Sequence, residues 1–401
     1  MGMIYLDHAA ATPVNERVFE AMKPYFSDDF FNPSAAYLPA KKVAQDYEAA
    51  KAKIAHTIGA KSADLIITAG ATEANNLAFT ALTLDGSCPR IFPHVAKAPW
   101  GAPKLGHPSM LYLETEHDSV RRVAESLGGQ PIRVLPSGII DLDDLRNKIS
   151  DETQMISVAL ANNELGTIQP LSEIAQLIRE VKLDRMKRRV KTQLLLHSDA
   201  SQALNLLDIN VARLGVDLLT LNAAKIYGPK GIGALYVTHD VKLKPLAVGG
   251  GQENGLRSGT ENVPLAIGFS KAAEIAHGHI NGNRKKYATW RKILLAELDG
   301  YELINKKRSL DSFVVICYEG LDAERLIFAL EEKGVYVATG AACAASKGIR
   351  SHVLKAIGLS ESQIAGSLRI SLGETNSEEQ IYQAAKIINQ VVRAEKERIN
   401  G

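Results

Sequence analysis

The chain has 401 residues, of which 46% are hydrophobic and 23% charged, so its composition is typical of a globular protein and its length favours two domains. The net charge of +2 excludes a global positive field that would favour nucleic acid. No apolar run is long enough to span a membrane, and residues 1–7 lack the pattern of a signal peptide, so we expect a cytoplasmic protein.

Short apolar runs alternate with helical stretches over the first two thirds of the chain. Strands are predicted at residues 64–68, 110–113, 155–160, 193–197, 216–221 and 233–237. Helices are predicted at residues 72–84 and 119–127 and beyond Leu171. Because the strands are apolar throughout, we expect a largely parallel sheet that is covered on both faces. The basic run from Lys182 to Lys191 is expected to be the solvated end of a helix, in preference to a binding patch.

The remaining segments do not continue this alternation of short strands and helices. Residues 86–108 contain five prolines, which exclude a helix or a central strand, so we expect an exposed excursion there. After about Asn262 come two long helical stretches, then a strand at 313–317, a helix near 323–332, a strand at 368–371 and a final amphipathic helix. This order predicts a separate α+β domain.

Three motifs lie close to a strand end, where ligands bind in parallel sheets. Residues 70–76 join a strand to a helix and either bind an anion through free N–H groups or are only an N-cap in a tight turn. Asp199 either holds a ring nitrogen protonated or caps a helix. Lys225, among small and apolar residues, is either a Schiff-base lysine or a lysine that snorkels from a strand end.

The three cysteines are too few, and odd in number, for a disulfide framework. Cys343 lies among small residues, so its thiol is expected to be exposed. Cys317 ends an apolar run and is expected in the core, whereas Cys88 is interpreted as incidental. We expect no metal site, because the spacing of Cys88, His94 and His107 matches no metal-binding pattern.

The order and spacing of these motifs resemble those of the cysteine desulfurases, in the class V aminotransferase-like group of fold-type I enzymes that use pyridoxal 5′-phosphate (PLP). The resemblance runs from residues 5–10 to 371–373 and is most specific at 70–73, 162–166, 225–231, 249–253 and 257–262. It implies an α/β fold, with a large domain over residues 15–262 that holds a mixed, mainly parallel seven-stranded sheet. It also implies a smaller α+β domain formed by residues 1–14 and 263–401.

The resemblance implies how the chain would hold PLP. Lys225 matches the Schiff-base lysine, Asp199 the carboxylate that pairs with the pyridinium nitrogen, and Gln202 the residue that bonds the phenolic oxygen. His117 matches a catalytic imidazole that stacks on the ring. The other cofactor-binding residues that it implies are Ala71, Thr72, Asn163, Asn222 and Thr260. Thr260 would reach the cofactor of a neighbouring subunit, which implies a homodimer.

The implied activity is that of a cysteine desulfurase. Asn163 and Arg369 match the groups that hold the substrate carboxylate. Lys225 would move protons at the substrate carbons, and Cys343 would take the sulfur of L-cysteine as a persulfide and leave L-alanine. The interval from Cys343 to His352 resembles the subgroup with a long, mobile loop. A sulfur-acceptor protein is expected, and iron–sulfur cluster biogenesis, transfer-RNA thiolation and cofactor synthesis stay open as destinations.

The chain departs from the family in several places. Ala224 stands where the family has a phosphate-binding histidine, which predicts weaker cofactor binding, and the sequence does not tell whether Ala224 is natural or engineered. Residues 86–108 look like an insertion, and the tail with which many relatives dock an iron–sulfur scaffold is shorter here. Two alternatives are therefore kept: a selenocysteine or cysteine-sulfinate lyase, and a low-activity PLP protein that serves as a platform for sulfur-transfer partners.

Overall fold

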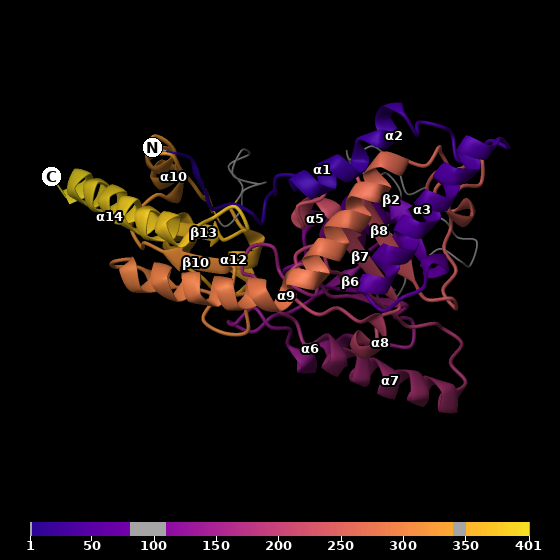
Figure 1. Cartoon of the computed structure of the whole chain (residues 1–401). Coiled ribbons are helices and arrows are strands. Elements are labelled where there is room, and N and C mark those ends of the chain that lie inside the picture. The colour runs from indigo at the N-terminus through magenta and orange to yellow at the C-terminus, as the bar shows by residue number, and fades with distance from the viewer. Residues whose placement is uncertain (1, 81–109, 340–349, 401) are drawn as a thin grey trace.

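The structure, a computed structural model, describes residues 2–80, 110–339 and 350–400. Figure 1 shows two parts side by side, a larger one built around a sheet and a smaller one that holds both the N-terminus and the C-terminal helix. The predictions for Cys88, for residues 86–108 and for Cys343 lie outside the described residues. Within the described ranges, no helix is both long and apolar enough to cross a membrane.

A seven-stranded sheet forms the centre of the larger part, in the order β2-β8-β7-β6-β5-β3-β4. Its strands are β2 Leu65–Thr68, β3 Met110–Leu113, β4 Gln130–Ile132, β5 Met155–Ser157, β6 Leu195–Asp199, β7 Leu218–Asn222 and β8 Gly233–Val237. β8 pairs antiparallel with both β2 and β7, and the other pairs in this sheet are parallel. Residues 223–232 are too few for a parallel crossover, which needs about a dozen residues or more. The prediction of a mixed, mainly parallel sheet is confirmed.

Helices cover both faces of this sheet. Successive strand side chains point to opposite faces, so Met110 and Tyr112 pack into one hydrophobic cluster while Leu111 and Leu113 pack into another. The first cluster includes α4 Ala71–Phe79 and α5 Asp118–Ser126. The second includes α1 Glu16–Met22, α3 Leu38–Thr57, α7 Leu171–Arg188 and the first half of α9 Val263–Glu297. Three shorter helices are α2 Pro24–Ser27, α6 Leu142–Lys148 and α8 Val211–Leu214.

The smaller part contains an antiparallel sheet in the order β12-β13-β10-β9 and a parallel pair, β1 with β11. Its strands are β1 Ile4–Tyr5, β9 Glu302–Leu303, β10 Phe313–Cys317, β11 Val335–Tyr336, β12 Ala338–Thr339 and β13 Ser367–Ser371. Its helices are α10 Ala323–Glu331, α12 His352–Ala356, α13 Glu361–Ala365 and α14 Glu378–Asn400. Cys317 is buried, as predicted. The pairing of β1 brings the first residues of the chain beside elements more than 300 residues later.

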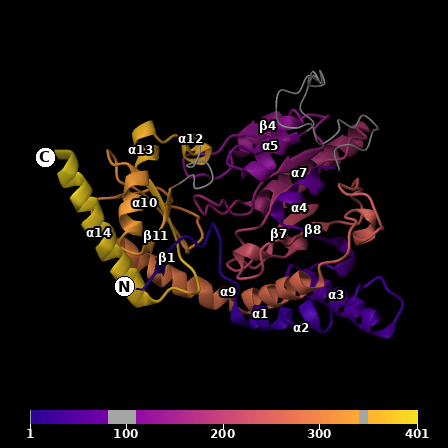
Figure 2. The same ribbon diagram turned by 90° about the horizontal axis from the view of Figure 1, so that it is seen from above.

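Several sequence predictions are corrected. The two helical stretches expected after Asn262 are one helix, α9, which packs against α3 in the larger part and against α14 in the smaller one (Figure 2). The strand expected at 155–160 ends at Ser157, and the strand expected at 193–197 runs from Leu195 to Asp199. Asp199 is therefore the last residue of a strand and not a helix N-cap.

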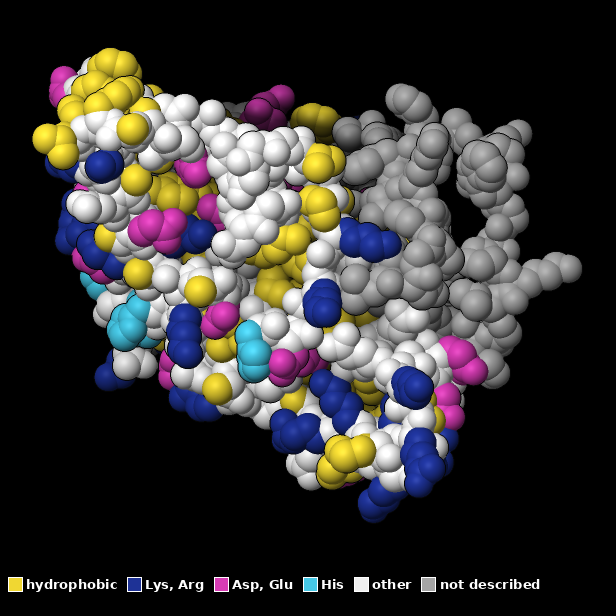
Figure 3. Space-filling view, turned by 90° about the vertical axis from the view of Figure 1, so that its right-hand side faces the viewer, with side chains coloured by type: hydrophobic (Ala, Val, Ile, Leu, Met, Phe, Trp, Pro, Cys, Tyr) yellow, Lys and Arg dark blue, Asp and Glu magenta, His cyan; other side chains and the backbone are white. Residues whose placement is uncertain are grey.

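The basic run on α7 is only partly a solvated helix end. Figure 3 shows Lys and Arg side chains gathered near the lower edge of the face on which α7 ends. Lys187 and Arg189 are exposed as predicted, but Arg185 is buried, with 3% of its surface accessible. Its guanidinium donates to the carbonyl oxygens of Ser150, Thr153 and Thr192. The prediction failed for Arg185 because those carbonyls come from loops that the local sequence does not bring near.

Candidate active site

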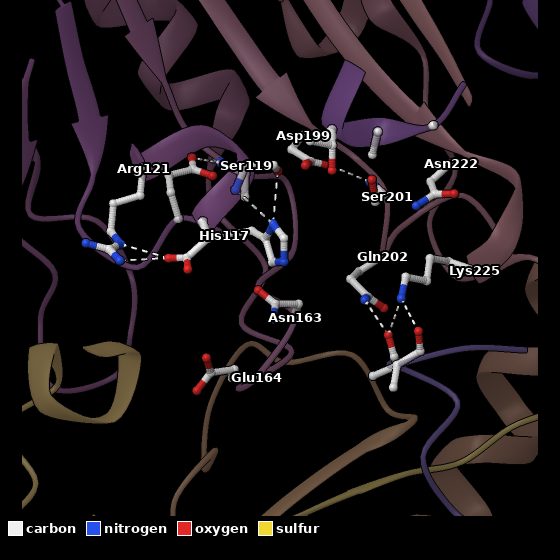
Figure 4. A pocket seen from close by; sticks show the side chains of 18 of the residues that line it. His117, Ser119, Arg121, Asn163, Glu164, Asp199, Ser201, Gln202, Asn222 and Lys225 are labelled. Carbon is white, nitrogen blue, oxygen red and sulfur yellow. Dashed lines mark hydrogen bonds and ion pairs between the residues drawn. The ribbon is translucent and has the colours of Figure 1, made fainter. Parts of the chain in front are cut away.

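A cavity of about 840 Å³ lies at the carboxyl ends of β3, β5, β6 and β7, between the larger and the smaller part. Nine of the residues expected at the site line it: Ala71, Thr72, His117, Asn163, Asp199, Gln202, Asn222, Lys225 and Arg369. Figure 4 shows most of these side chains around one space. Because parallel strands end at the same edge, residues from four separate segments meet there.

Lys225 ends the short turn that follows β7, and its amine reaches the N-terminal segment of the chain. Nζ donates to the carbonyl oxygen of Ala9 at 2.9 Å and also to that of Ala10. Gln202 donates to the same Ala9 oxygen at 3.0 Å. Figure 4 shows both side chains directed toward these carbonyls. The lysine is thus held at the cavity wall by hydrogen bonds and does not snorkel to solvent.

Asp199 is nearly buried, with 8% of its surface accessible, and both of its carboxylate oxygens accept hydrogen bonds. Oδ2 accepts from the Asn75 amide at 2.9 Å, and Oδ1 accepts from the Ser201 backbone at 2.9 Å. The Asn75 amide also donates to Ser119 at 2.8 Å, which ties β6 to the start of α5. A carboxylate held in this way is a fixed negative charge that points into the cavity.

His117 and residues 70–72 form the next part of the wall. His117 caps α5, where its Nδ1 accepts from the Ser119 backbone at 3.1 Å, and its ring is exposed. Gly70 is the N-cap of α4, and its φ of 145° is one that L side chains rarely adopt. The first N–H groups of α4 therefore face the cavity beside Ala71 and Thr72, which suits an anion.

Arg369 reaches the cavity from β13 of the smaller sheet, and only 4% of its side chain is exposed. Its guanidinium pairs with Asp7 at 2.6 Å and donates to the Asn163 carbonyl oxygen at 3.0 Å. The Asn163 loop is in turn held by Asn162, which donates to the Thr115 carbonyl oxygen at 2.8 Å. The cavity lining thus combines the Arg369 guanidinium with the Asp199 carboxylate and the Lys225 amine.

Two buried carboxyls beside the cavity were not expected from the sequence. Burial raises the pKa of Glu116 to about 8, and the nearby Asp199 charge adds to the rise. Burial also raises the pKa of Glu164 to about 7. Glu116 accepts from the Ala159 backbone at 2.6 Å, and Glu164 accepts from Ser351 at 2.5 Å. The position of Glu116 next to His117 was the signal that could have identified it.

Not every predicted site residue is found among the residues that line the cavity. Thr260 is exposed and is not among the residues that line the cavity of its own chain. Cys343 lies outside the described residues. Ala224 lines the cavity beside Lys225, and its backbone N–H donates to the Asn222 side chain at 3.0 Å. Ala9 and Ala10, which the sequence analysis did not identify as site residues, supply the acceptors for Lys225.

Known proteins match this chain over nearly its whole length. The sequence model of the family described as Aminotransferase class-V matches residues 4–88 and 104–383. Cysteine desulfurase IscS 1 of Archaeoglobus fulgidus is 34% identical over 399 residues, which covers 97% of each chain. A solved structure titled NifS-like protein has a TM-score of 0.85 and 27% identity, and the match covers 98% of this chain and 100% of that one. A structure titled SspA in complex with cysteine has a TM-score of 0.76 and 33% identity, with 92% and 98% covered. The chain belongs to the aminotransferase class-V family.

Proposed function

We propose that the protein is a cysteine desulfurase that uses PLP. The reaction converts L-cysteine and the Cys343 thiol into L-alanine and a Cys343 persulfide. The carbon–sulfur bond of the substrate breaks and a sulfur–sulfur bond forms. The electron pair of the broken bond stays on carbon, which is then protonated. The observation that carries the proposal is one cavity that combines the amine of Lys225, the buried carboxylate of Asp199 and the guanidinium of Arg369. Relatives named cysteine desulfurase support the choice of substrate.

The residues of the cavity fit PLP. Asp199 is a buried carboxylate suited to a protonated ring nitrogen, and the start of α4 suits a phosphate. The hydroxyl of Ser201, which lines the cavity, is buried and has no hydrogen-bond partner among the described residues. When bound, the cofactor supplies an aldehyde that links to an amine and a ring that accepts electrons.

In this proposal each of the described cavity residues has a separate role. Asp199 and Gln202 orient the cofactor ring, and His117 stacks on it. Ala71, Thr72 and Asn222 bind its phosphate, and Asn163 contacts both cofactor and substrate. Arg369 and Asn163 hold the substrate carboxylate, while Lys225 removes the α-proton and returns protons to the product.

Cys343 is the proposed nucleophile, and its thiolate is the reactive form. We expect Cys343→Ser to form no L-alanine from L-cysteine while it keeps the visible absorbance of bound PLP. Cys88→Ser is the matched control and should keep the wild-type rate. Alanine release, measured beside the absorbance spectrum, checks both. Full activity of Cys343→Ser would point to a lyase that needs no thiol.

The proposal extends to assembly and organisation. We propose a homodimer in which Thr260 contacts the phosphate in the neighbouring subunit. The exposure of Thr260 and its absence from the cavity of its own chain support this arrangement.

We also propose the domain division at residues 15–262, with 1–14 and 263–401 in the smaller domain. The pairing of β1 with β11 supports the assignment of the first residues to the smaller domain. Delivery of sulfur to an acceptor protein is part of the proposal.

A further inference from the structure

Tyr227, two residues after Lys225, has a backbone conformation that is rare for a bulky side chain. Its φ is 63°, in the left-handed region, and only 5% of its surface is exposed. Such a conformation persists only where the surroundings hold it, and it is often found at functional sites. The contacts of Tyr227 therefore indicate what the conformation serves.

The backbone of Tyr227 is bound to the N-terminal segment on both sides. Its N–H donates to Thr12 Oγ1 at 2.9 Å, and its carbonyl oxygen accepts from the Asn15 backbone at 2.9 Å. Thr12 Oγ1 also donates to the Ala224 carbonyl oxygen at 3.1 Å. These bonds hold the turn that carries Lys225 against the segment whose Ala9 and Ala10 carbonyls accept from the lysine.

The side chain of Tyr227 points the other way, to the strand that carries Arg369. Its hydroxyl accepts from the Glu374 backbone at 2.6 Å and lies 3.3 Å from His8 Nδ1. Glu374 follows β13 closely, and His8 is next to Asp7, which pairs with Arg369. Burial lowers the pKa of His8 to about 4, so its ring is neutral near pH 7 and shares one hydrogen bond with the hydroxyl through Nδ1.

We propose that Tyr227 is a positioning residue that keeps the Lys225 amine and the Arg369 guanidinium in register, so that one amino acid meets both groups. The inference rests on the proposed function, in which Lys225 takes the α-proton and Arg369 holds the carboxylate of the same substrate. These two groups are attached to one carbon, so a small shift of either anchor breaks the match. Misplacement by about 1 Å is enough to cost a large part of a rate.

L-alanine and ethylamine form the test pair, because they differ only in the carboxylate. Binding of each to the PLP-loaded protein is followed by the change in visible absorbance. Tyr227→Phe removes the hydroxyl and keeps the ring. We expect it to weaken L-alanine binding about tenfold and to leave ethylamine binding unchanged. The matched control, Tyr318→Phe, also removes a buried tyrosine hydroxyl, and it should change neither affinity.

Equal weakening of both ligands, or no weakening of either, would overturn the inference. His8→Leu removes the other partner of the hydroxyl and gives the same readout if Tyr227→Phe does not fold. Arg369→Lys distinguishes the role of Tyr227 from the existence of the proposed substrate site. If wild-type protein prefers L-alanine and Arg369→Lys loses that preference, the proposed substrate site holds even where Tyr227→Phe has no effect. If the wild type shows no preference, the proposed substrate site itself fails.

Discussion

Ala224 occupies a wall position where a charged or polar donor would face the cofactor phosphate. It lines the cavity next to Lys225, and its methyl group offers no hydrogen bond. Asn222 has an amide at the same wall, and its oxygen accepts from the Ala224 backbone, which leaves the amide nitrogen as the donor. In the proposed site the phosphate would therefore depend on the start of α4 and on Asn222, with no contribution from the side chain at position 224.

We predict that Ala224→His raises the affinity for PLP. One added hydrogen bond to a charged phosphate is worth about 1.5–3 kcal/mol, which corresponds to a gain of roughly 10- to 100-fold. Titration of the apoprotein with PLP, followed by absorbance, measures the change. Ala224→Leu is the control, because it adds bulk without a donor. An equal gain in both variants would mean that the histidine acts only by filling space.

Glu116 gives a pH dependence whose sign follows from its burial. Its pKa rises from 4.5 to about 8 on folding because the carboxyl is desolvated. Between these pH values the folded state holds a proton that the unfolded state has lost, so the free energy of unfolding falls as pH rises. The slope from this residue is at most about 1.4 kcal/mol per pH unit.

We predict that Glu116→Gln reduces the loss of stability between pH 5 and 8. The amide stays neutral throughout and can still accept from the Ala159 backbone. Urea unfolding of the apoprotein at both pH values measures the difference. Glu332→Gln, at an exposed position, should leave the pH dependence as in the wild type. Parallel pH profiles for Glu116→Gln and the wild type would contradict the prediction.

At the scale of the element, the end of α7 shows how one residue joins a helix to two loops. Arg185 donates to three carbonyl groups, two before β5 and one before β6. Without the guanidinium, all three carbonyls would lose this donor, and the loss is costly at the buried Thr153. The helix end is therefore secured by one buried cation, and the exposed Arg188 adds a pair of hydrogen bonds to Asp151.

We predict that Arg185→Ala lowers the free energy of unfolding by about 2–4 kcal/mol. Lys187→Ala, two residues away and exposed, should change it by about 0.5 kcal/mol or less. Denaturant unfolding of the two variants beside the wild type gives the comparison. Similar values for both variants would show that Arg185 contributes no more than its exposed neighbours.

At the scale of the whole molecule, the proposed dimer makes each active site depend on two chains. Lys225 lines the cavity of its own chain, whereas Thr260 does not line it. If Thr260 serves the neighbouring site, a defect at Lys225 of one chain and a defect at Thr260 of the other chain fall in the same site of a mixed dimer. One site of that dimer then has both residues intact.

We predict that mixing Lys225→Ala with Thr260→Glu chains restores activity that neither variant has alone. Random exchange would give about one quarter of the wild-type activity, since half the dimers are mixed and each has one intact site. Lys225→Ala mixed with Asp199→Asn is the control, because both residues line the same cavity. Absence of recovery in the first mixture would place Thr260 in its own chain's site.

Local patterns predicted the parts that depend on neighbours in sequence. Continuous apolar runs predicted the strands at 110–113 and 233–237, and the strand ends placed Asp199 and Lys225 at one edge of the sheet. The motif order also predicted the family. These predictions succeeded because burial and chain direction are recorded in the spacing of apolar and small residues.

Only the tertiary structure decided the contacts between distant residues. Lys225 meets Ala9, Arg369 meets Asp7, and Tyr227 meets Glu374, and each pair is separated by more than 140 residues. Such contacts depend on how the two parts of the molecule pack, and no local pattern records that packing. The amino-acid order by itself therefore determined the strands and the chemical groups of the site. The fold decided which distant segments hold those groups in place.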